Sequence, residues 1–364
     1  MINDQSYMKL ALDLAENTEG QTSPNPVVGA VVVKEGRILG MGAHLKAGTE
    51  HAEVHALAMA GDEAAGADIY VTLEPCSHYG KTPPCADTII NKGIKRAVIA
   101  TSDPNPQVAG KGIQKLKEAG VEVVLEVEKE RADWLNRKFF HFMKAKTPYV
   151  TLKSATSLDG KTATVTGESQ WITEKEARED VHYSRHTHDA ILAGVETVKK
   201  DNPSLTTRLP SGGAHPIRVI LDTNLRTPLQ AKMLHDGLAP VWIICGSDND
   251  EQKVKQYKSL GAEVIKMSHS SISLQEMLNV LGERNIQSLY VEGGATVAGS
   301  FVKERAFQEV IMYMAPKLIG GKDAPTAVGG TGIANINEAI ALDIISVEKA
   351  GDDLKITARP KEAF

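Results

Sequence analysis

One histidine, one glutamate and two cysteines constrain the first third of this chain more than any other feature. His51 and Glu53 are separated by a single alanine, and Cys76 and Cys85 follow further along the chain. One imidazole and two thiolates form a three-ligand set for Zn²⁺ and leave a fourth coordination position open to water, as catalytic zinc sites do. The segment is therefore expected to fold so that three distant side chains meet at one metal.

Local sequence indicates how these ligands are presented. We expect helices over 52–59 and 85–91 and a strand over 68–73, so that each ligand lies where a loop or strand meets a helix. Residues i and i+2 of a regular helix point to different faces, so His51 and Glu53 share a site only if His51 caps the helix and Glu53 lies in its first turn. The positive end of a helix dipole also favours the thiolate form of cysteine.

A His-x-Glu motif followed by Pro-Cys and a further cysteine is typical of zinc-dependent deaminases that act on nucleobases. In such a site Glu53 would take a proton from the attacking water and pass it to the ring nitrogen and the leaving amine. The alternative is a structural zinc site, for which His44, His55 or His78 could supply the fourth ligand.

Length and composition limit the remaining possibilities. A chain of 364 residues suits two domains, and a helix expected over 133–144, followed by Pro148, places their boundary between 1–146 and 147–364. A net charge of −5 and 5% aromatic residues give no basis for binding nucleic acid. We find no apolar run approaching the ~20 residues that span a membrane. Because the motif takes two of the three cysteines, a reducing cytoplasm is expected.

Both predicted domains alternate strands and helices, which indicates an α/β fold. The first opens with a hairpin expected over 27–43. In the second, a strand expected over 288–292 leads into Gly293-Gly294 and then a helix. Glycines let a backbone approach a phosphate, and a helix N-terminus attracts its charge, so this passage is either a dinucleotide-phosphate site or a tight turn.

Several longer segments resemble the bifunctional deaminase/reductase family of riboflavin biosynthesis. They include NPVVGAVVV, HAEVHA, VTLEPCSHYGKTPPC, LKSATSLDGKTA and YVEGG, and the resemblance covers nearly the whole chain. It implies a cytidine-deaminase-like three-layer α/β/α domain followed by a dihydrofolate-reductase-like α/β domain. It further implies a homo-oligomer, with a tetramer suggested by the family.

The resemblance implies two reactions on a phosphorylated pyrimidine. The first is zinc-dependent hydrolytic deamination of 2,5-diamino-6-(5-phosphoribosylamino)pyrimidin-4(3H)-one. The second is NADPH-dependent reduction of the ribosyl group to ribityl. Two alternatives remain open from the residues alone. One is a single-function nucleoside, nucleobase or tRNA deaminase with a C-terminal binding module, and the other is a zinc-stabilised scaffold without catalysis.

The resemblance also assigns roles to individual residues. In the deaminase domain it implies zinc ligands His51, Cys76 and Cys85, a general acid/base Glu53, pyrimidine contacts Asn25, His44, His78 and Lys81, and ribose-phosphate contacts Asp103 and Asn105. In the reductase domain the cofactor site would include Ala155, Trp171, Thr197, Asp201, Thr223, Gly294, Ala295, Thr296, Val297, Ala298, Gly299 and Ser300. The substrate would contact Ser169, Arg185, Leu205, Arg208 and Glu292, with Lys153, Asp201 and Glu292 as possible proton donors.

Overall fold

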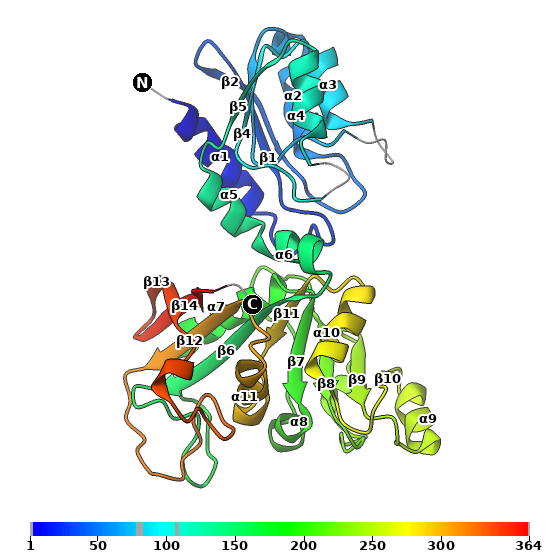
Figure 1. Cartoon of the computed structure of the whole chain (residues 1–364), viewed down its shortest axis with the longest axis vertical. Helices are drawn as coiled ribbons and strands as arrows, with labels where there is room; N and C mark the ends of the chain where they lie inside the picture. The colour runs from blue at the N-terminus through cyan, green and yellow to red at the C-terminus, as the bar shows by residue number, and fades with distance from the viewer. Residues whose placement is uncertain (1–2, 78–82, 106–108, 363–364) are drawn as a thin grey trace. The chain divides into compact units, whose positions relative to one another are not determined.

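A computed structural model describes residues 3–77, 83–105 and 109–362 of the chain. It divides into two compact units, Met1–Lys146 and Thr147–Phe364, each with its own sheet (Figure 1). In the described part of the chain, no helix is both long and apolar enough to cross a bilayer.

The N-terminal unit is built on a five-stranded sheet of order β2-β1-β3-β4-β5. The predicted hairpin over 27–43 is confirmed, because β1 pairs antiparallel with β2 through the turn at residues 35–36. On its other edge β1 pairs antiparallel with β3, whereas β3, β4 and β5 run parallel. The strand bounds are β1 (Gly29–Lys34), β2 (Arg37–Ala43), β3 (Asp68–Val71), β4 (Arg96–Ile99) and β5 (Glu122–Leu125).

Helices cover both faces of this sheet, which gives three layers (Figure 1). Alternation along β1 separates the two cores: Val32 packs with α2, α3 and α4, and Val31 and Val33 pack with α1 and α5. The helices are α1 (Asp4–Glu16), α2 (Ala52–Ala60), α3 (Cys85–Asn91), α4 (Lys111–Glu118), α5 (Lys129–Leu135) and α6 (Arg137–Ala145), with a 3₁₀ turn η1 (Gly61–Ala64).

The prediction of one helix over 133–144 is wrong, because α5 and α6 are separated at Asn136. The Asn136 amide accepts a hydrogen bond from the Val27 N–H and donates one to the Val27 carbonyl oxygen, both at 3.0 Å. This buried long-range pair holds Asn136 at the junction of the two helices, and helical periodicity alone carries no sign of it.

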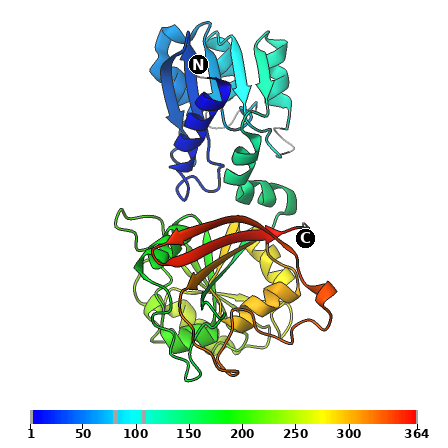
Figure 2. The same cartoon turned by 90° about the vertical axis from the view of Figure 1, so that its left-hand side faces the viewer.

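The C-terminal unit contains a nine-stranded sheet of order β10-β9-β8-β7-β11-β6-β12-β14-β13. All pairs from β10 to β12 are parallel, and the β13–β14 hairpin adds antiparallel strands at one edge (Figure 2, red). The bounds are β6 (Tyr149–Ser157), β7 (Ala190–Gly194), β8 (Ile217–Leu221), β9 (Val241–Cys245), β10 (Glu263–Lys266), β11 (Ser288–Val291), β12 (Glu309–Ala315), β13 (Leu342–Ala350) and β14 (Asp353–Pro360).

Helices again cover both faces, with α7, α8 and α9 against one hydrophobic cluster and α10 and α11 against another. The parallel strands end at a common edge, where loops of α/β proteins bind ligands. The helices are α7 (Lys175–His186), α8 (Val195–Asp201), α9 (Glu251–Ser259), α10 (Leu274–Glu283) and α11 (Ala295–Lys303), with 3₁₀ turns η2 (Lys232–Leu234) and η3 (Ile336–Glu338).

Close packing of α1 on β1 yields a first prediction. A Cβ atom added at Gly29 would lie 1.9 Å from the Ala11 carbonyl oxygen, so Gly29→Ala forces the helix and the strand apart. We expect it to lower the free energy of unfolding of the N-terminal unit by about 1–3 kcal/mol in urea titrations. Met59→Ala, which truncates an exposed side chain on α2, is the control and should change this free energy by less than about 0.5 kcal/mol. Equal effects of the two variants would contradict this packing.

Candidate active sites

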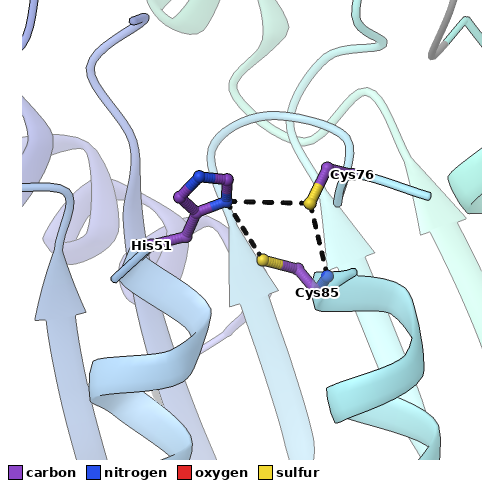
Figure 3. A group of neighbouring side chains, drawn as sticks. All are labelled: His51, Cys76 and Cys85. Carbon is purple, nitrogen blue, oxygen red and sulfur yellow. Dashed lines mark hydrogen bonds between the residues drawn. The ribbon is translucent and has the colours of Figure 1, made fainter. Parts of the chain in front are cut away.

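His51, Cys76 and Cys85 converge at one point in the N-terminal unit (Figure 3). Their ligand atoms all lie within 4.8 Å of one another, with His51 Nδ1 3.2 Å from Cys85 Sγ and 3.7 Å from Cys76 Sγ. His51 is the N-cap of α2, Cys85 is the first residue of α3, and Cys76 follows the turn after β3. Two helix N-termini and one strand end therefore supply the three donors.

The two cysteines differ in their tendency to ionise. Hydrogen bonds from the Cys85 thiol, from His51 and from the Cys85 backbone N–H lower the pKa of Cys76 below its usual range, although burial opposes this. The pKa of Cys85 is raised by its hydrogen bond to Cys76 and by burial. A thiolate beside a second thiol and an imidazole is a soft donor set that fits Zn²⁺.

The described residues provide no fourth ligand for this group. Within 3–77, 83–105 and 109–362, His51, Cys76 and Cys85 form a set of three that no further histidine, cysteine or carboxylate joins. His44 and His55 stay outside the set, and His78 lies outside the described residues. Three protein donors are the arrangement of catalytic zinc sites.

Glu53 lies beside this set in the first turn of α2 and is 3% exposed. Burial raises its pKa to about 7, against the lowering effect of His51. Its Oε2 atom is buried and has no hydrogen-bond partner in the part of the chain that the structure describes. A carboxyl group with an unpaired oxygen and a pKa near neutrality suits proton transfer in both directions.

Asn25 and His44 form a hydrogen-bonded pair next to His51. The His44 ring lies edge-on to His51, with ring centroids 5.3 Å apart. Asn25 Nδ2 lies 3.0 Å from His44 Nε2, and His44 Nδ1 lies 3.1 Å from the Glu50 carbonyl oxygen. This fits a neutral imidazole that accepts from Asn25 and donates to Glu50. Burial also lowers the pKa of His44.

The other expected deaminase contacts are only partly described. Asp103 and Asn105 follow the strand β4, and the backbone N–H of Asp103 donates to the Glu74 carboxylate at 3.3 Å. His78 and Lys81 lie outside the described residues. Sequence reasoning missed Glu74 itself, although a glutamate at a strand end, directly before Pro-Cys, was a readable signal.

In the C-terminal unit Glu292 connects two cations at the carboxyl end of β11. Arg185 binds it through both oxygens, with Nε–Oε1 2.7 Å and Nη2–Oε2 3.0 Å, and Lys153 Nζ lies 3.7 Å from Oε2. Burial alone would raise the pKa of Glu292, but Arg185 and Lys153 outweigh it and hold the pKa at about 2. Burial lowers the pKa of Lys153 despite the attraction of Glu292.

Arg208 and His182 extend this charged group. Burial and the positive charge of Arg185 lower the pKa of Arg208. Burial and the two arginines lower the pKa of His182 to about 4, so its imidazole is neutral at pH 7. His182 was not predicted as a site residue. Its neighbours Glu292, at the end of β11, and Arg208 come from distant parts of the sequence.

Of the expected cofactor residues, Thr197 and residues 294–300 lie in or directly before the helices that follow β7 and β11. A Cβ atom at Gly294 would approach Thr197 Oγ1 to 3.7 Å, and one at Gly194 would lie 2.9 Å from Val297 Cγ2. Helices α8 and α11 therefore begin next to each other at the carboxyl edge of the sheet. Exposed backbone N–H groups at a helix start, without a Cβ atom at Gly294, fit a phosphate group of a dinucleotide.

The other expected reductase residues belong to different elements of the unit. Ala155 belongs to β6, Asp201 ends α8, and Thr223 follows β8. Trp171 is 64% exposed and stacks under the Arg178 guanidinium, whose carbon lies 4.6 Å from the ring centroid. Gly299 faces Gly329, because a Cβ atom there would lie 2.2 Å from the Gly329 carbonyl oxygen.

Leu205 has an unusual backbone. Its φ of 50° is rare for a branched residue, and its side chain is buried in a hydrophobic cluster. This conformation directs the neighbouring carbonyl oxygens of Ser204 and Thr206 toward the guanidinium groups of Arg218 and Arg185, at 3.3 and 3.0 Å. The buried arginines thus fix the loop that carries Leu205 and Arg208.

Two family descriptions match consecutive parts of the chain. "Cytidine and deoxycytidylate deaminase zinc-binding region" matches residues 1–101, and "RibD C-terminal domain" matches residues 148–356. The fold and donor set of the N-terminal unit are thus those of zinc-dependent deaminases, and the C-terminal unit is a reductase domain of dihydrofolate-reductase-like fold that uses NADPH.

Similar proteins cover the whole chain. The riboflavin biosynthesis protein RibD of Bacillus amyloliquefaciens is 53% identical, over 99% of this chain and 97% of its own. The structure of Acinetobacter baumannii RibD is 38% identical with a TM-score of 0.89 and 99% coverage of both chains. A Thermotoga maritima diaminohydroxyphosphoribosylaminopyrimidine deaminase/5-amino-6-(5-phosphoribosylamino)uracil reductase is 36% identical with a TM-score of 0.86 and 98% coverage of both.

The chain belongs to the RibD family of bifunctional deaminases and reductases in riboflavin biosynthesis. The predicted family, α/β fold class and use of zinc and NADPH are therefore confirmed.

The Glu292 ion pairs yield a prediction on pH and stability. Because folding lowers the Glu292 pKa from 4.5 to about 2, the stabilisation is complete above pH 4.5 and is lost as the pH falls toward 2. In urea titrations the wild type should exceed Glu292→Gln in free energy of unfolding at pH 7, and this difference should shrink by roughly 3 kcal/mol in acid. A difference that stays constant from pH 7 to pH 3 would contradict the ion pairing.

Proposed function

We propose that the unit formed by residues 1–146 deaminates 2,5-diamino-6-(5-phosphoribosylamino)pyrimidin-4(3H)-one. The unit formed by residues 147–364 would then reduce the ribosyl group of the product to ribityl with NADPH. One observation carries the proposal: His51, Cys76 and Cys85 converge within 4.8 Å beside a buried glutamate whose Oε2 has no partner among the described residues. The name of the Thermotoga relative supports the choice of substrate.

In the deaminase site His51, Cys76 and Cys85 would hold the metal. When bound, Zn²⁺ supplies a Lewis acid that makes water a nucleophile near neutral pH. Glu53 would accept one proton from that water at Oε2 and give it to the ring nitrogen, and would then pass the second proton of the same water oxygen to the leaving amine. Water and the amino compound are thereby converted to the carbonyl compound and ammonia. The pKa of Glu53, raised to about 7, lets its carboxyl group both accept and donate a proton near neutral pH.

Asn25 and His44 would contact the pyrimidine ring. Their mutual hydrogen bond and the bond from His44 to Glu50 hold both side chains next to His51. His78 and Lys81 would contact the same ring, and Asp103 and Asn105 the ribose phosphate. The acidic Asp103 is suited to ribose hydroxyl groups, which donate hydrogen bonds to a carboxylate.

In the reductase site Arg185 and Arg208 would bind the substrate phosphate, and Ser169, Leu205 and Glu292 would complete the contacts. When bound, NADPH supplies a hydride. Among the three possible proton donors Lys153 is favoured, because its pKa is lowered while Glu292, with a pKa of about 2, carries no proton at pH 7. Asp201 remains a possible donor at the end of α8.

The cofactor would lie along the carboxyl edge of the nine-stranded sheet. Residues 294–300 would bind its phosphates through the start of α11, with Thr197, Asp201 and Thr223 beside them and Ala155 and Trp171 near the nicotinamide. The approach of Gly294 to Thr197 supports this grouping. Exposure of Trp171 leaves its ring accessible to a planar ligand.

We further propose that the protein acts in the cytoplasm as a homotetramer. All three cysteines are unpaired in the structure, as expected in a reducing compartment. The tetramer rests on the family resemblance, and light scattering of the purified chain tests it.

The direct test supplies the zinc-loaded chain with the diaminopyrimidine phosphate. Without NADPH we expect ammonia alone. Addition of NADPH should then produce NADP⁺ and the ribityl compound. Ammonia without any NADPH oxidation would disprove the reductase assignment, and oxidation without ammonia would disprove the deaminase assignment.

Separate sites lead to a prediction for Cys76→Ser. Removal of one zinc ligand should abolish deamination, whereas reduction of separately supplied deaminated intermediate should persist within about twofold. Cys245→Ser, which alters a buried thiol in β9, is the matched control and should retain zinc and deamination. Loss of both activities in Cys76→Ser would contradict independent sites.

Proton transfer by Glu53 leads to a prediction for Glu53→Gln. The amide cannot accept the water proton, so kcat for deamination should fall by about 10²-fold or more. Zinc content, measured by atomic emission, should stay at one ion per chain. Glu118→Gln, at an exposed position on α4, should leave kcat unchanged. Full activity of Glu53→Gln would contradict the role given to this carboxyl group.

A further inference from the structure

Glu74 is a buried carboxylate that none of the proposed chemistry uses, and it is only 4% exposed. Among the residues that the structure describes, four backbone N–H groups donate to it. Oε1 accepts from Gly112 at 3.0 Å and Ile113 at 3.2 Å, and Oε2 accepts from Gly110 at 3.0 Å and Asp103 at 3.3 Å. Hydrogen bonds to a charged acceptor are stronger than those between neutral groups, so this carboxylate holds the four backbone N–H groups firmly in place.

Both ends of the segment from Asp103 to Gly110 meet at the same oxygen, Oε2. Further bonds lie between these ends: the Asn105 N–H donates to Asp103 Oδ1 at 2.8 Å, and the Ala109 N–H donates to the Asn105 carbonyl oxygen at 2.9 Å. The position of Asp103 and Asn105 therefore depends on where the Glu74 carboxylate lies.

The backbone next to Glu74 leads directly to the metal site. A Cβ atom at Gly112 would lie 2.0 Å from the Pro75 carbonyl oxygen, so α4 begins in direct contact with the turn that carries Cys76. On the opposite side, the Cys76 carbonyl oxygen accepts the Ala86 N–H at 3.1 Å, and Cys76 Sγ accepts the Cys85 N–H at 3.3 Å. The 74–76 turn is thus held between the starts of α3 and α4.

We propose that Glu74 is a positioning residue of the deaminase. It fixes Asp103 and Asn105 relative to Cys76, and so sets the distance between the metal and the contacts to the ribose phosphate. The inference rests on the proposed function, in which Asp103 and Asn105 contact that part of the substrate. Glu74 touches neither reacting atom nor substrate and acts only through these two residues.

A carboxylate is required because all four partners are donors. Glutamine offers one acceptor oxygen and turns an NH₂ group toward two backbone N–H groups, which then lack partners. The helix start cannot compensate, because the N-cap of α4 is Gly110, which has no side chain to cap it. In Glu74→Gln, either the N–H groups of Asp103 and Gly110 or those of Gly112 and Ile113 lose their acceptor. Either loss weakens the attachment of these residues to residues 74–76.

The test is Glu74→Gln in the zinc-loaded full chain. The unsatisfied donors should raise KM for the phosphoribosyl substrate about tenfold, with kcat within about threefold and one zinc per chain. The inhibition constant of the phosphoribosyl product should rise by the same factor, whereas that of the sugar-free pyrimidine should not change. Glu74→Asp keeps the charge on a shorter side chain and should show a smaller increase.

Two controls separate positioning from stability. Asp4→Asn removes the negative charge that pairs with Arg96 in the same unit and should destabilise it without changing KM. The reductase activity of each preparation reports an intact second unit. If Glu74→Gln does not fold, the inhibition constants of the phosphoribosyl product and of the sugar-free pyrimidine are compared in Glu74→Asp instead.

Three outcomes would overturn the inference: an unchanged KM, equal weakening of both inhibitors, or loss of zinc and kcat at constant KM. Asp103→Ala and Asn105→Ala distinguish this from failure of the proposed function. If these variants weaken phosphoribosyl binding while Glu74→Gln does not, only the positioning role is wrong. If none of the three affects it, the proposed ribose-phosphate contacts are wrong as well.

Discussion

The meeting of two helix starts with one strand end is the constraint on which the deaminase unit depends. His51 is the N-cap of α2 and Cys85 is the first residue of α3, so both side chains lie at helix N-termini, where the helix dipole favours negative charge. Cys76 joins them from the end of β3 and accepts the first N–H of α3 on its sulfur. The fold thus brings the imidazole and the two sulfur atoms together, and the core between sheet and helices fixes their spacing.

The two units organise charge in different ways. In the deaminase unit burial raises the pKa of Glu53 to about 7, so this carboxyl group can exchange protons near neutral pH. In the reductase unit Glu292 is also mostly buried, with its side chain 12% exposed, but Arg185 and Lys153 hold its pKa at about 2, so it stays ionised beside them. The pKa is therefore raised for one glutamate and lowered for the other, and the difference comes from which groups the fold places beside each carboxyl group.

Features that depend on local sequence pattern could be predicted. The spacing of His51, Glu53, Cys76 and Cys85, the hairpin over 27–43 and the glycine pair before α11 could all be read from consecutive residues. Parts that depend on distant partners could not. Asn136, at the break between α5 and α6, pairs with Val27, and the left-handed Leu205 lies between two residues whose carbonyl oxygens bind Arg218 and Arg185. The hydrogen-bond partners of Glu74 and the arginines that lower the pKa of His182 include residues far along the chain, which the local sequence does not reveal.

X-ray absorption at the zinc edge of the loaded full chain tests the central claim most directly, since it counts the donors around the metal. An open catalytic position predicts two sulfur atoms at about 2.3 Å, a single imidazole, and one further light atom from solvent at about 2.0 Å. A second imidazole or a third sulfur would mean that protein closes the coordination shell, and the account of hydrolytic deamination at this site would be wrong.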